Sequence, residues 1–491
     1  MRYLISLFGV LFLTGLMSCQ TIYQPVLPDE DNTTVLPEQK VTSAEIHSRD
    51  YLLPCSLDEK ISNQEGQSKP EKITLSLEQC LRIAREKNRQ LLISREGKEK
   101  ARGMLKEAKS GRYPLLQTNL SYTRIDEVST FNVGGISTTT GVLDNYKGEV
   151  SLQQVLYQGG RIDAAIGSAR LNQQLAEMQF SDTEELIIFQ VTRAYDDVLL
   201  NQEIWDVNRK SLDTSMAQRD NIKALNKQGM SSDYELLRAE VQVSNLRSVM
   251  LQSESNLKLS ILALLRTIGA PTGDDNVRIE LTDRLEYKPQ ASALGKNFEQ
   301  ALETAFRKRP DLAQARLMID IQNKNITMVK SELRPSFSLF ANTGEEKPSR
   351  KVMGGNEWGD YWNAGATISF PLFEGGRVKG KLIQARADLQ QYEISLRDTE
   401  EKASYEVRQA MLVLKDAEEL IVSQKENVKQ AEEGLRLAEL GFKNGVNTQL
   451  EVMDAQTALD LARKNYLSAV YNYNIAVVML EKATGTLKEN H

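Results

Sequence analysis

Glu451 and Asp454 are the acidic pair whose spacing most invites a chemical role in this sequence. Side chains three residues apart on a helix lie on one face, about one turn from each other. Two carboxylates this close raise each other's pKa and attract cations. The spacing predicts a cation-attracting site. The alternative is an ordinary solvated helix face, because 26% of the residues are charged.

Catalysis has little support elsewhere in the chain. Only two histidines occur, His47 and His491, so a histidine-based triad or a histidine-rich metal site has almost nothing to work with. Scattered carboxylates on helix faces do not form an acid/base pair without a cleft. The net charge of −6 gives no reason to expect nucleic acid. We therefore expect no catalytic residue, no metal site, no cofactor and no nucleic-acid partner.

Cys19 is the residue with a predicted covalent modification. Arg2 precedes an apolar run from Leu4 to Leu13, and Leu16-Met17-Ser18-Cys19 resembles the cleavage and lipidation sequence of bacterial lipoproteins. We expect residues 1–18 to be a signal peptide, Cys19 to carry lipid, and residues 19–72 to form an extended, lipid-anchored segment. The alternative is an ordinary cleavable signal peptide.

Cys55 and Cys80 are the two other cysteines of the chain. An exported protein resides in a compartment that permits disulfides, so these two residues can pair. Two unpaired thiols are an equally good interpretation, because Cys80 lies on a predicted helix and Cys55 in an irregular segment.

The elements that position these residues occur twice. Residues 77–114 align without a gap onto 298–335, and residues 159–269 align onto 375–485. Each copy predicts a helix, two strands, a very long helix, a tight turn and a long helix, and such self-similarity is typical of repeat architectures. The expected ranges are 73–270 for repeat 1 (strands 115–123 and 146–156, helices 161–227 and 232–268), 271–296 for a linker in the equatorial region, 297–485 for repeat 2 (strands 336–343 and 361–371, helices 377–443 and 448–484), and 486–491 for a tail.

The strands alternate apolar and polar side chains. In repeat 1, Leu116, Leu120 and Tyr122 alternate with Gln117 and Asn119. A strand of this length with one apolar and one polar face is typical of a membrane barrel, although a soluble sheet gives the same pattern. After residue 19 no run of about 18 apolar residues occurs, so a membrane span requires strands. Four strands are fewer than the roughly eight of the smallest closed barrel, so several chains, two or three, must share one.

The long helices carry a heptad pattern. From Leu382 to Phe442 apolar or small residues recur at alternating spacings of three and four, the pattern of a coiled-coil seam. A helix of this kind, with roughly 65 residues, reaches about 100 Å at 1.5 Å per residue. We interpret the seam as packing that builds a wall, not as a ligand site.

Glycine and proline mark the bends of both repeats. The predicted strand-to-helix bends contain Pro114, Gly159, Gly160, Pro335, Gly375 and Gly376. Glycine tolerates the backbone angles such a bend needs, and the glycine pairs lack the Lys-Ser/Thr of a phosphate-binding loop. The turns between the long helices are predicted at Gly229, Met230, Ser231 and Ser232, and at Gly445, Val446, Asn447 and Thr448, with Ser232 and Thr448 as candidate N-caps.

The order of elements and several motifs resemble the TolC family of outer-membrane channel-tunnels over about residues 73–485. The motifs are Gln158-Gly159-Gly160-Arg161, Pro371-Leu372-Phe373-Glu374-Gly375-Gly376-Arg377, and the turn Gly445-Val446-Asn447-Thr448 followed by Glu451-Val452-Met453-Asp454-Ala455. The resemblance implies a homotrimer whose twelve strands form one barrel in the outer membrane, continued by a periplasmic α-helical coiled-coil barrel. The lipidation motif is similar to that of the family's efflux lipoprotein branch.

The resemblance also implies roles for the tips. In the family the turns Gly229–Ser232 and Gly445–Thr448 are the places where a periplasmic adaptor protein docks, and an inner-membrane pump completes the assembly. Threefold symmetry places six carboxylates, from Glu451 and Asp454, around the narrow periplasmic entrance. The expected function is a passive outer-membrane conduit for small molecules such as drugs or metals. Type I protein secretion and a non-conducting structural coiled-coil lipoprotein are the alternatives.

Overall fold

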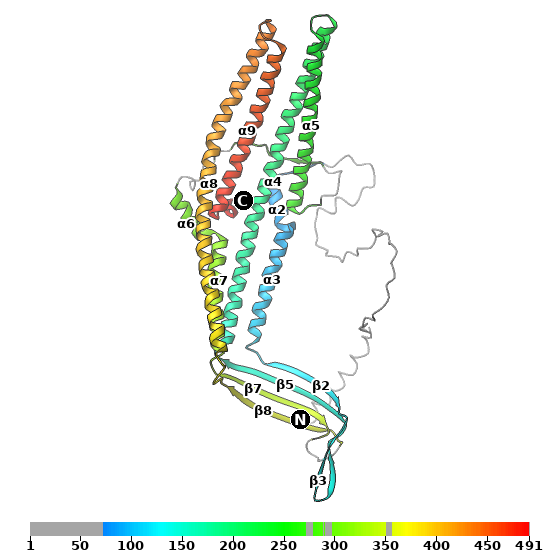
Figure 1. Ribbon diagram of the computed structural model, residues 1–491, viewed down its shortest axis with the longest axis vertical. Helices are drawn as coiled ribbons and strands as arrows, with labels where there is room; N and C mark the ends of the chain where they lie inside the picture. Colours follow the sequence, from blue (N-terminus) through cyan, green and yellow to red (C-terminus); the bar gives the residue numbers. More distant parts are fainter. Residues whose placement is uncertain (1–71, 272–277, 288, 290–296, 350–355, 491) are drawn as a thin grey trace, which may run out of the picture. The chain divides into compact units, whose positions relative to one another are not determined.

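The computed structural model describes residues 72–271, 278–287, 289, 297–349 and 356–490. Repeat 1 consists of α2 (Leu77–Lys87), α3 (Arg89–Ser110), β2 (Leu115–Arg124), β5 (Asp144–Gln158), α4 (Arg161–Lys227) and α5 (Asp233–Ile268). Repeat 2 consists of α6 (Phe298–Lys308), α7 (Pro310–Ser331), β7 (Ser336–Lys347), β8 (Gly359–Ser369), α8 (Arg377–Lys443) and α9 (Gln449–Thr484). Within these residues the helices run away from one end of the sheet, and the fold class predicted from the sequence is confirmed (Figure 1).

The first helix of each repeat is broken in two, where the sequence predicted a single helix per copy. Asn88 has an extended backbone (φ −64°, ψ 123°), ends α2 and caps α3 by accepting from the N–H groups of Gln90 and Leu91. In repeat 2, Arg309 takes the same conformation and Pro310 is the first residue of α7. Proline is favoured at the first helical position because the backbone N–H that it lacks would have no acceptor within the helix there.

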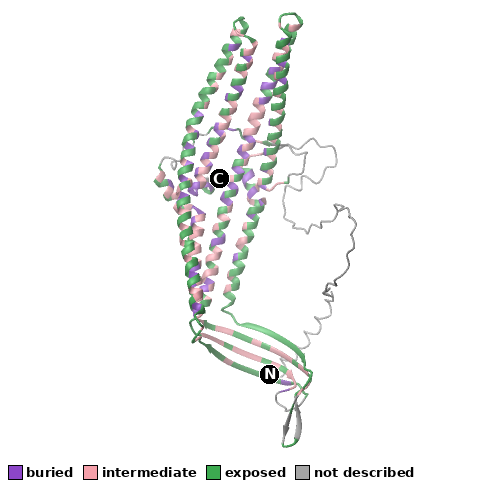
Figure 2. Cartoon of the chain, in the orientation of Figure 1, coloured by how far each residue is buried: buried purple, intermediate pink, exposed green. Residues whose placement is uncertain are grey.

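The sheet has the order β2-β5-β7-β8, and all neighbours are antiparallel. Its register separates two faces. One carries apolar side chains, among them Leu120, Val150 and Trp362, and the other carries polar side chains, among them Asn119 and Asn363. The alternation predicted from the sequence is therefore present in three dimensions. Within the described part of the chain β2 and β8 each have one unpaired edge, and β2 is exposed along its whole length (Figure 2).

The structure bears out the duplication in detail. Leu115 pairs with Gln153 in repeat 1 and Ser336 with Ser369 in repeat 2, which is the same pairing shifted by 221 and 216 residues. At the helix breaks, Asn88 Nδ2 donates to Thr267 O, and Arg309 NH1 donates to Ala483 O. Arg309 is the repeat-2 equivalent of Asn88 at the shift of 221 residues, and Ala483 is the equivalent of Thr267 at the shift of 216 residues.

The core lies where the helices of both repeats meet. One cluster joins α2, α4, α5 and α9 around residues that include Ile187, Val191, Tyr195 and Leu264. The other joins α6, α8 and α9, and the middle of the predicted α8 seam is buried in it. That stretch comprises Val407, Ala410, Leu414, Ala417 and Ile421. Burial of Leu and Val side chains at this spacing, with Ala between them, is what holds helices close together.

Several short elements lie outside the predicted pattern. β1 (Lys72–Leu75) pairs in parallel with β6 (Arg278–Leu281), which falls in the expected linker. β3 (Ser129–Val133) and β4 (Ile136–Thr140) form a hairpin between β2 and β5, with Gly134 and Gly135 at positive φ in its turn. α10 (Leu487–Asn490) occupies the expected tail. None of the described helices has an apolar stretch long enough to cross a membrane.

Candidate functional site

The two helix turns lie at the end of the long helices remote from the sheet (Figure 1). Gly229 (φ 73°) and Gly445 (φ 72°) both adopt the left-handed conformation that ends a helix. Ser232 and Thr448 then cap the returning helices α5 and α9 in reciprocal capping boxes. Met230 and Val446 are 66% and 80% exposed at the tips of the turns. The predicted turn chemistry is confirmed, and each turn presents an apolar side chain to solvent.

Glu451 has a structural partner in its own turn. Its Oε2 accepts from the N–H of Thr448 at 2.6 Å and from the Thr448 hydroxyl at 3.2 Å. Asp454 is exposed on the same helix. The counterpart of Glu451 in repeat 1 is Glu235, which makes the same contact with Ser232, whereas the counterpart of Asp454 is Arg238. One copy of the chain therefore presents the acidic pair only at the second tip.

The polar face of the sheet carries two separate sets of hydrogen-bonded side chains, one charged and one of amides. Tyr361 OH donates to Glu149 Oε2 at 2.7 Å, and Lys147 Nζ lies 2.7 Å from the same oxygen. Farther along the sheet, Asn342 Nδ2 donates to Asn363 Oδ1 at 2.9 Å. Such a face suits contact with water and charged solutes, and the opposite, apolar face suits contact with lipid.

The strand-to-helix bends follow the predicted glycines. Gly160 (φ 88°) and Gly376 (φ 84°) are the N-cap residues of α4 and α8, and both are left-handed. Gly159 also has no room for a side chain, because a Cβ there would lie 2.6 Å from Ser331 O. Gly375 (φ 61°) occupies the equivalent bend with nothing within 4 Å of such a Cβ. Pro114 and Pro335 immediately precede β2 and β7.

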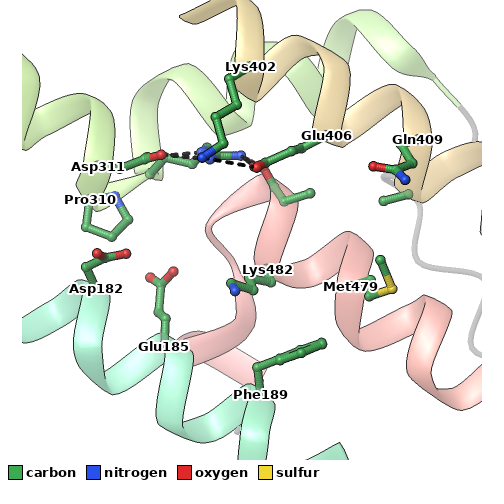
Figure 3. Close-up of a pocket in the computed structure, with 13 residues that line it drawn as sticks. Asp182, Glu185, Phe189, Pro310, Asp311, Lys402, Glu406, Gln409, Met479 and Lys482 are labelled. Atoms are coloured by element: carbon green, nitrogen blue, oxygen red, sulfur yellow. Dashed lines mark hydrogen bonds and ion pairs between the residues drawn. The ribbon is translucent and has the colours of Figure 1, made fainter. Parts of the chain in front are cut away.

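A pocket lies where α4, α7, α8 and α9 meet (Figure 3). The buried guanidinium of Arg309 pairs with Asp311 at 2.7 Å and with Glu406 at 2.7 Å. Asp182 and Glu185 reach into the pocket from α4, and Lys482 does so from α9 (Figure 3). Sequence reasoning did not select this pocket, since its residues come from distant segments and match no motif.

Burial raises the pKa of two acids in this pocket. The pKa of Glu185 rises to about 7, chiefly because the side chain is buried and also because Asp182 lies nearby, while Lys488 and Arg309 oppose the rise. Burial also raises the pKa of Asp182, with Asp311 adding to the effect. Glu185 therefore changes charge near neutral pH, which makes the pocket a proton-sensitive part of the fold.

The remaining predicted residues divide between described and undescribed parts of the chain. Cys80 is a free thiol with no exposed surface, on the face of α2 that packs into the core. Cys19, Cys55, the signal peptide and most of the predicted lipid-anchored segment lie outside the described residues, as do both histidines. Among the residues that the structure describes, no group of three His, Cys, Asp or Glu side chains is arranged to hold a metal ion.

The sequence matches the family profile described as outer membrane efflux protein over residues 80–270 and 301–486. The two matched segments cover most of the chain and coincide with the two repeats. The chain belongs to the outer membrane efflux protein family. The resemblance to TolC channel-tunnels, first drawn from the glycine motifs and the tip turn, is thereby confirmed.

Characterised relatives include both efflux and secretion proteins. Outer membrane protein TolC of Vibrio cholerae is 26% identical over 69% of this chain and 76% of its own length. The proteases secretion protein PrtF of Dickeya chrysanthemi is 22% identical over 78% of this chain and 82% of its own length. The probable efflux pump outer membrane protein TtgC of Pseudomonas putida is 22% identical over 84% of this chain and 83% of its own length.

Solved structures share the fold at low sequence identity. A membrane protein from Pseudomonas aeruginosa superposes with a TM-score of 0.72 and 19% identity, covering 83% of this chain and 92% of that one. The CmeC outer membrane channel of Campylobacter jejuni superposes with a TM-score of 0.70 and 15% identity, covering 84% of this chain and 86% of that one. The chain has the fold of outer membrane channels.

Proposed function

We propose that this protein is the outer-membrane channel of a tripartite efflux system, a passive homotrimeric conduit from periplasm to exterior. The observation that carries the proposal is the two-faced sheet. Its register collects the polar side chains on one side, and its two edges have no partner strand among the described residues. Unpaired strand edges are not tolerated in lipid, because each unsatisfied backbone group costs several kcal/mol. Three copies supply twelve strands, and the polar faces then line the lumen.

The tips are the proposed contact with the rest of the pump. Met230 and Val446 project from turns that are followed by capping boxes, and exposed apolar side chains there suit a protein partner. We assign this surface to a periplasmic adaptor that links the channel to an inner-membrane pump. The acidic pair Glu451 and Asp454 stands one turn inside the same end, where three copies form a cation-attracting entrance.

We also propose a lipid anchor at Cys19, near the start of the sequence. Cys19 follows an apolar run and a lipidation-type sequence, and a lipid there adds to the membrane attachment that strands supply. Replacement of Cys19 by Ala removes the lipid mass from the purified protein. Mass spectrometry of the intact chain that found no lipid on the unaltered protein would end this part of the proposal.

Protein secretion is the second candidate function. The relative PrtF is named for protease secretion, and it matches this chain over a length similar to that of the efflux relative TtgC. The two candidates differ in the pump that opens the channel, so deletion of the gene followed by separate assays of drug tolerance and of secreted proteins distinguishes them. Raised drug sensitivity with unchanged secretion favours efflux, and the reverse favours secretion.

Channel recording tests the proposal directly. The purified protein in detergent is expected to have the mass of three chains, and in a planar bilayer it is expected to conduct ions in small, cation-preferring steps. A stable single-chain species that neither inserts in bilayers nor conducts would overturn the conduit and would favour a structural coiled-coil lipoprotein instead.

A further inference from the structure

One acid in the pocket of Figure 3 is buried without a partner. Glu185 is 6% exposed, and its carboxylate makes no hydrogen bond or ion pair with the described residues. Its side chain points into the pocket, which the start of α7 and part of α8 line from the other side (Figure 3). A buried carboxylate ordinarily has a donor or a cation beside it, because an isolated charge is costly to bury. A positive group is therefore missing at this point.

Three side chains of α4 form the wall that carries this acid. Asp182, Glu185 and Phe189 follow one another at spacings of three and four residues, so they share one face of the helix. All three line the pocket. The wall thus presents two carboxylates and, one turn farther along, an aromatic ring.

Two of the cations on the opposite walls are already paired. The guanidinium of Arg309 donates to the two carboxylate oxygens of Asp311 at 3.0 and 2.7 Å and lies 2.7 Å from Glu406. Lys402 Nζ lies 3.9 Å from the same Glu406 side chain. An anionic ligand would have to displace these carboxylates, so the pocket does not suit an anion.

Lys482 is the remaining cation of the described lining. Its Nζ lies 5.0 Å from the centre of the Phe189 ring, and it forms no ion pair with the described carboxylates. Four acids and three bases line the pocket, which leaves a charge of −1 when all of them are ionised. Asp182 and Glu185 are the two acids that share this incomplete compensation.

The rest of the lining determines what kind of cation fits. Pro310, Ala410 and Met479 add apolar surface to the Phe189 ring, and the pocket has a volume of about 520 Å³, a size ordinary for small-molecule sites. Within the described residues no three acidic, histidine or cysteine side chains are arranged as metal ligands. An ammonium group joined to a hydrocarbon matches both the charge and the walls.

We propose that this pocket binds a small organic cation, a protonated amine that carries a short apolar group. The ammonium group lies between Asp182 and Glu185, and the apolar group contacts Phe189 and Met479. The site is complete within one chain, so the inference goes beyond the proposed conduit and does not depend on it. Because α4 belongs to repeat 1 and α7, α8 and α9 belong to repeat 2, a bound amine joins the two repeats.

The amine and a proton compete for Glu185. The pKa of this carboxyl is about 7, so it is mostly protonated at pH 6 and mostly ionised at pH 8. Binding should therefore be roughly tenfold stronger at pH 8 than at pH 6. The charged groups that face Glu185 are Asp182 on α4, Arg309 and Asp311 at the start of α7, Lys402 and Glu406 on α8, Lys482 on α9 and Lys488 on α10.

A titration with simple probes tests the site in the full-length protein purified from membranes. The probe is 2-phenylethylamine, followed by ligand-observed NMR with protein-free micelles as the blank, and saturable binding is expected. The uncharged 2-phenylethanol and the anionic 3-phenylpropionate should bind roughly tenfold more weakly or worse. Equal binding of the amine and the alcohol, or no saturable binding of the amine, would overturn the proposal.

Matched variants place the amine in the pocket. Glu185→Gln with Asp182→Asn removes both charges at nearly constant volume and should weaken binding roughly tenfold and abolish its dependence on pH. Glu401→Gln with Asp398→Asn is the control, because these are the same two positions of repeat 2 and are exposed on α8. Equal losses in the two variants would show that the amine binds elsewhere, and so would unchanged binding in the first.

A variant that gains affinity guards against a mere folding defect. Lys482→Met keeps the apolar stem and removes the cation that competes with the ammonium group, so binding at pH 8 should become several-fold stronger. Unchanged or weaker binding would contradict the assignment of the ammonium site. A protein that conducts ions and binds no amine would overturn this inference and leave the conduit intact.

Discussion

At the scale of single residues, the glycines and caps were predictable and the charge partners were not. The residue types of Gly445 and Thr448 alone predict a helix-ending turn and an N-cap. The capping role of Glu451 could also have been drawn from its place three residues after Thr448. Glu406 meets Arg309 only because α8 packs against α6 and α7 within repeat 2, and no local spacing encodes that contact.

The entrance acids are expected to bind cations without depending on the cap. Glu451→Gln with Asp454→Asn keeps a capping side chain at position 451 and removes both charges. In bilayers the variant should need roughly tenfold more divalent cation for half-maximal block, equivalent to about 1.4 kcal/mol. Glu235→Gln is the control, because its neighbour at the place of Asp454 is Arg238. Equal block in the double variant and the unaltered protein would reject the acidic entrance.

Glu185 is expected to make stability depend on pH. Its pKa is about 7 in the folded chain against 4.5 for the free side chain, so the folded state binds the proton more tightly. The stabilisation is complete below about pH 4.5 and is lost as the pH rises through about 7. The apparent Tm of the unaltered protein should therefore fall between about pH 5 and about pH 8 more than that of Glu185→Gln. Glu177→Gln, an exposed acid on the same helix, should leave the fall unchanged; identical profiles for all three proteins would contradict the assignment.

At the scale of elements, length and periodicity determined what could be foreseen. The two 67-residue helices coincide with the ranges expected from the heptad seam, because a long pattern averages out local ambiguity. The break at Asn88 was missed because one asparagine in a helical pattern is a weak signal, although Pro310 marks the same break in repeat 2. The β1–β6 pair joins four-residue segments about two hundred positions apart, and such pairing leaves no local trace. The β3–β4 hairpin did have a signal, the Gly134-Gly135 turn.

A buried hydrogen bond joins the two long hairpins. Ser211 Oγ on α4 donates to Asp460 Oδ2 on α9 at 2.5 Å, and both side chains are buried. Ser211→Ala leaves a buried carboxylate oxygen without this donor, at a cost of about 1–3 kcal/mol. We expect a lower apparent Tm by circular dichroism. Thr214→Ala removes a hydroxyl that bonds only within its own helix, so a drop of the same size in both variants would argue against the link.

At the scale of the whole molecule, the sequence indicated that one chain is incomplete, since four strands cannot close. Nothing in its composition specifies which surfaces meet. The structure shows exposed apolar side chains on helix faces, such as Ile93 and Ile394, which are candidates for a contact between copies. A single exposed apolar side chain on a helix face does not by itself identify an interface. It does so better when the equivalent residue of the other repeat lies in a contact inside the chain.

A single buried charge is expected to prevent assembly without unfolding the chain. Ile93 is 72% exposed in one copy, so Ile93→Asp should leave the helix content unchanged. If this face meets the next copy of the proposed homotrimer, the contact buries the carboxylate, and the trimer should dissociate to single chains in detergent. Val422→Asp is the control, because the Val422 side chain is 69% exposed, close to the value for Ile93, and its repeat-1 counterpart is already Asp206. A trimer of normal mass carrying Ile93→Asp would exclude this face from the contact.

The exchange of Asp454 for Arg238 between two tips of the same backbone shape limits how a neighbouring protein can recognise them. In the proposed ring of three copies, an acidic hairpin would alternate with a hairpin of mixed charge, so the charge pattern would repeat three times and not six. Six identical copies of a partner protein would therefore meet two different kinds of hairpin tip, and only three of the six would contact a pair of carboxylates.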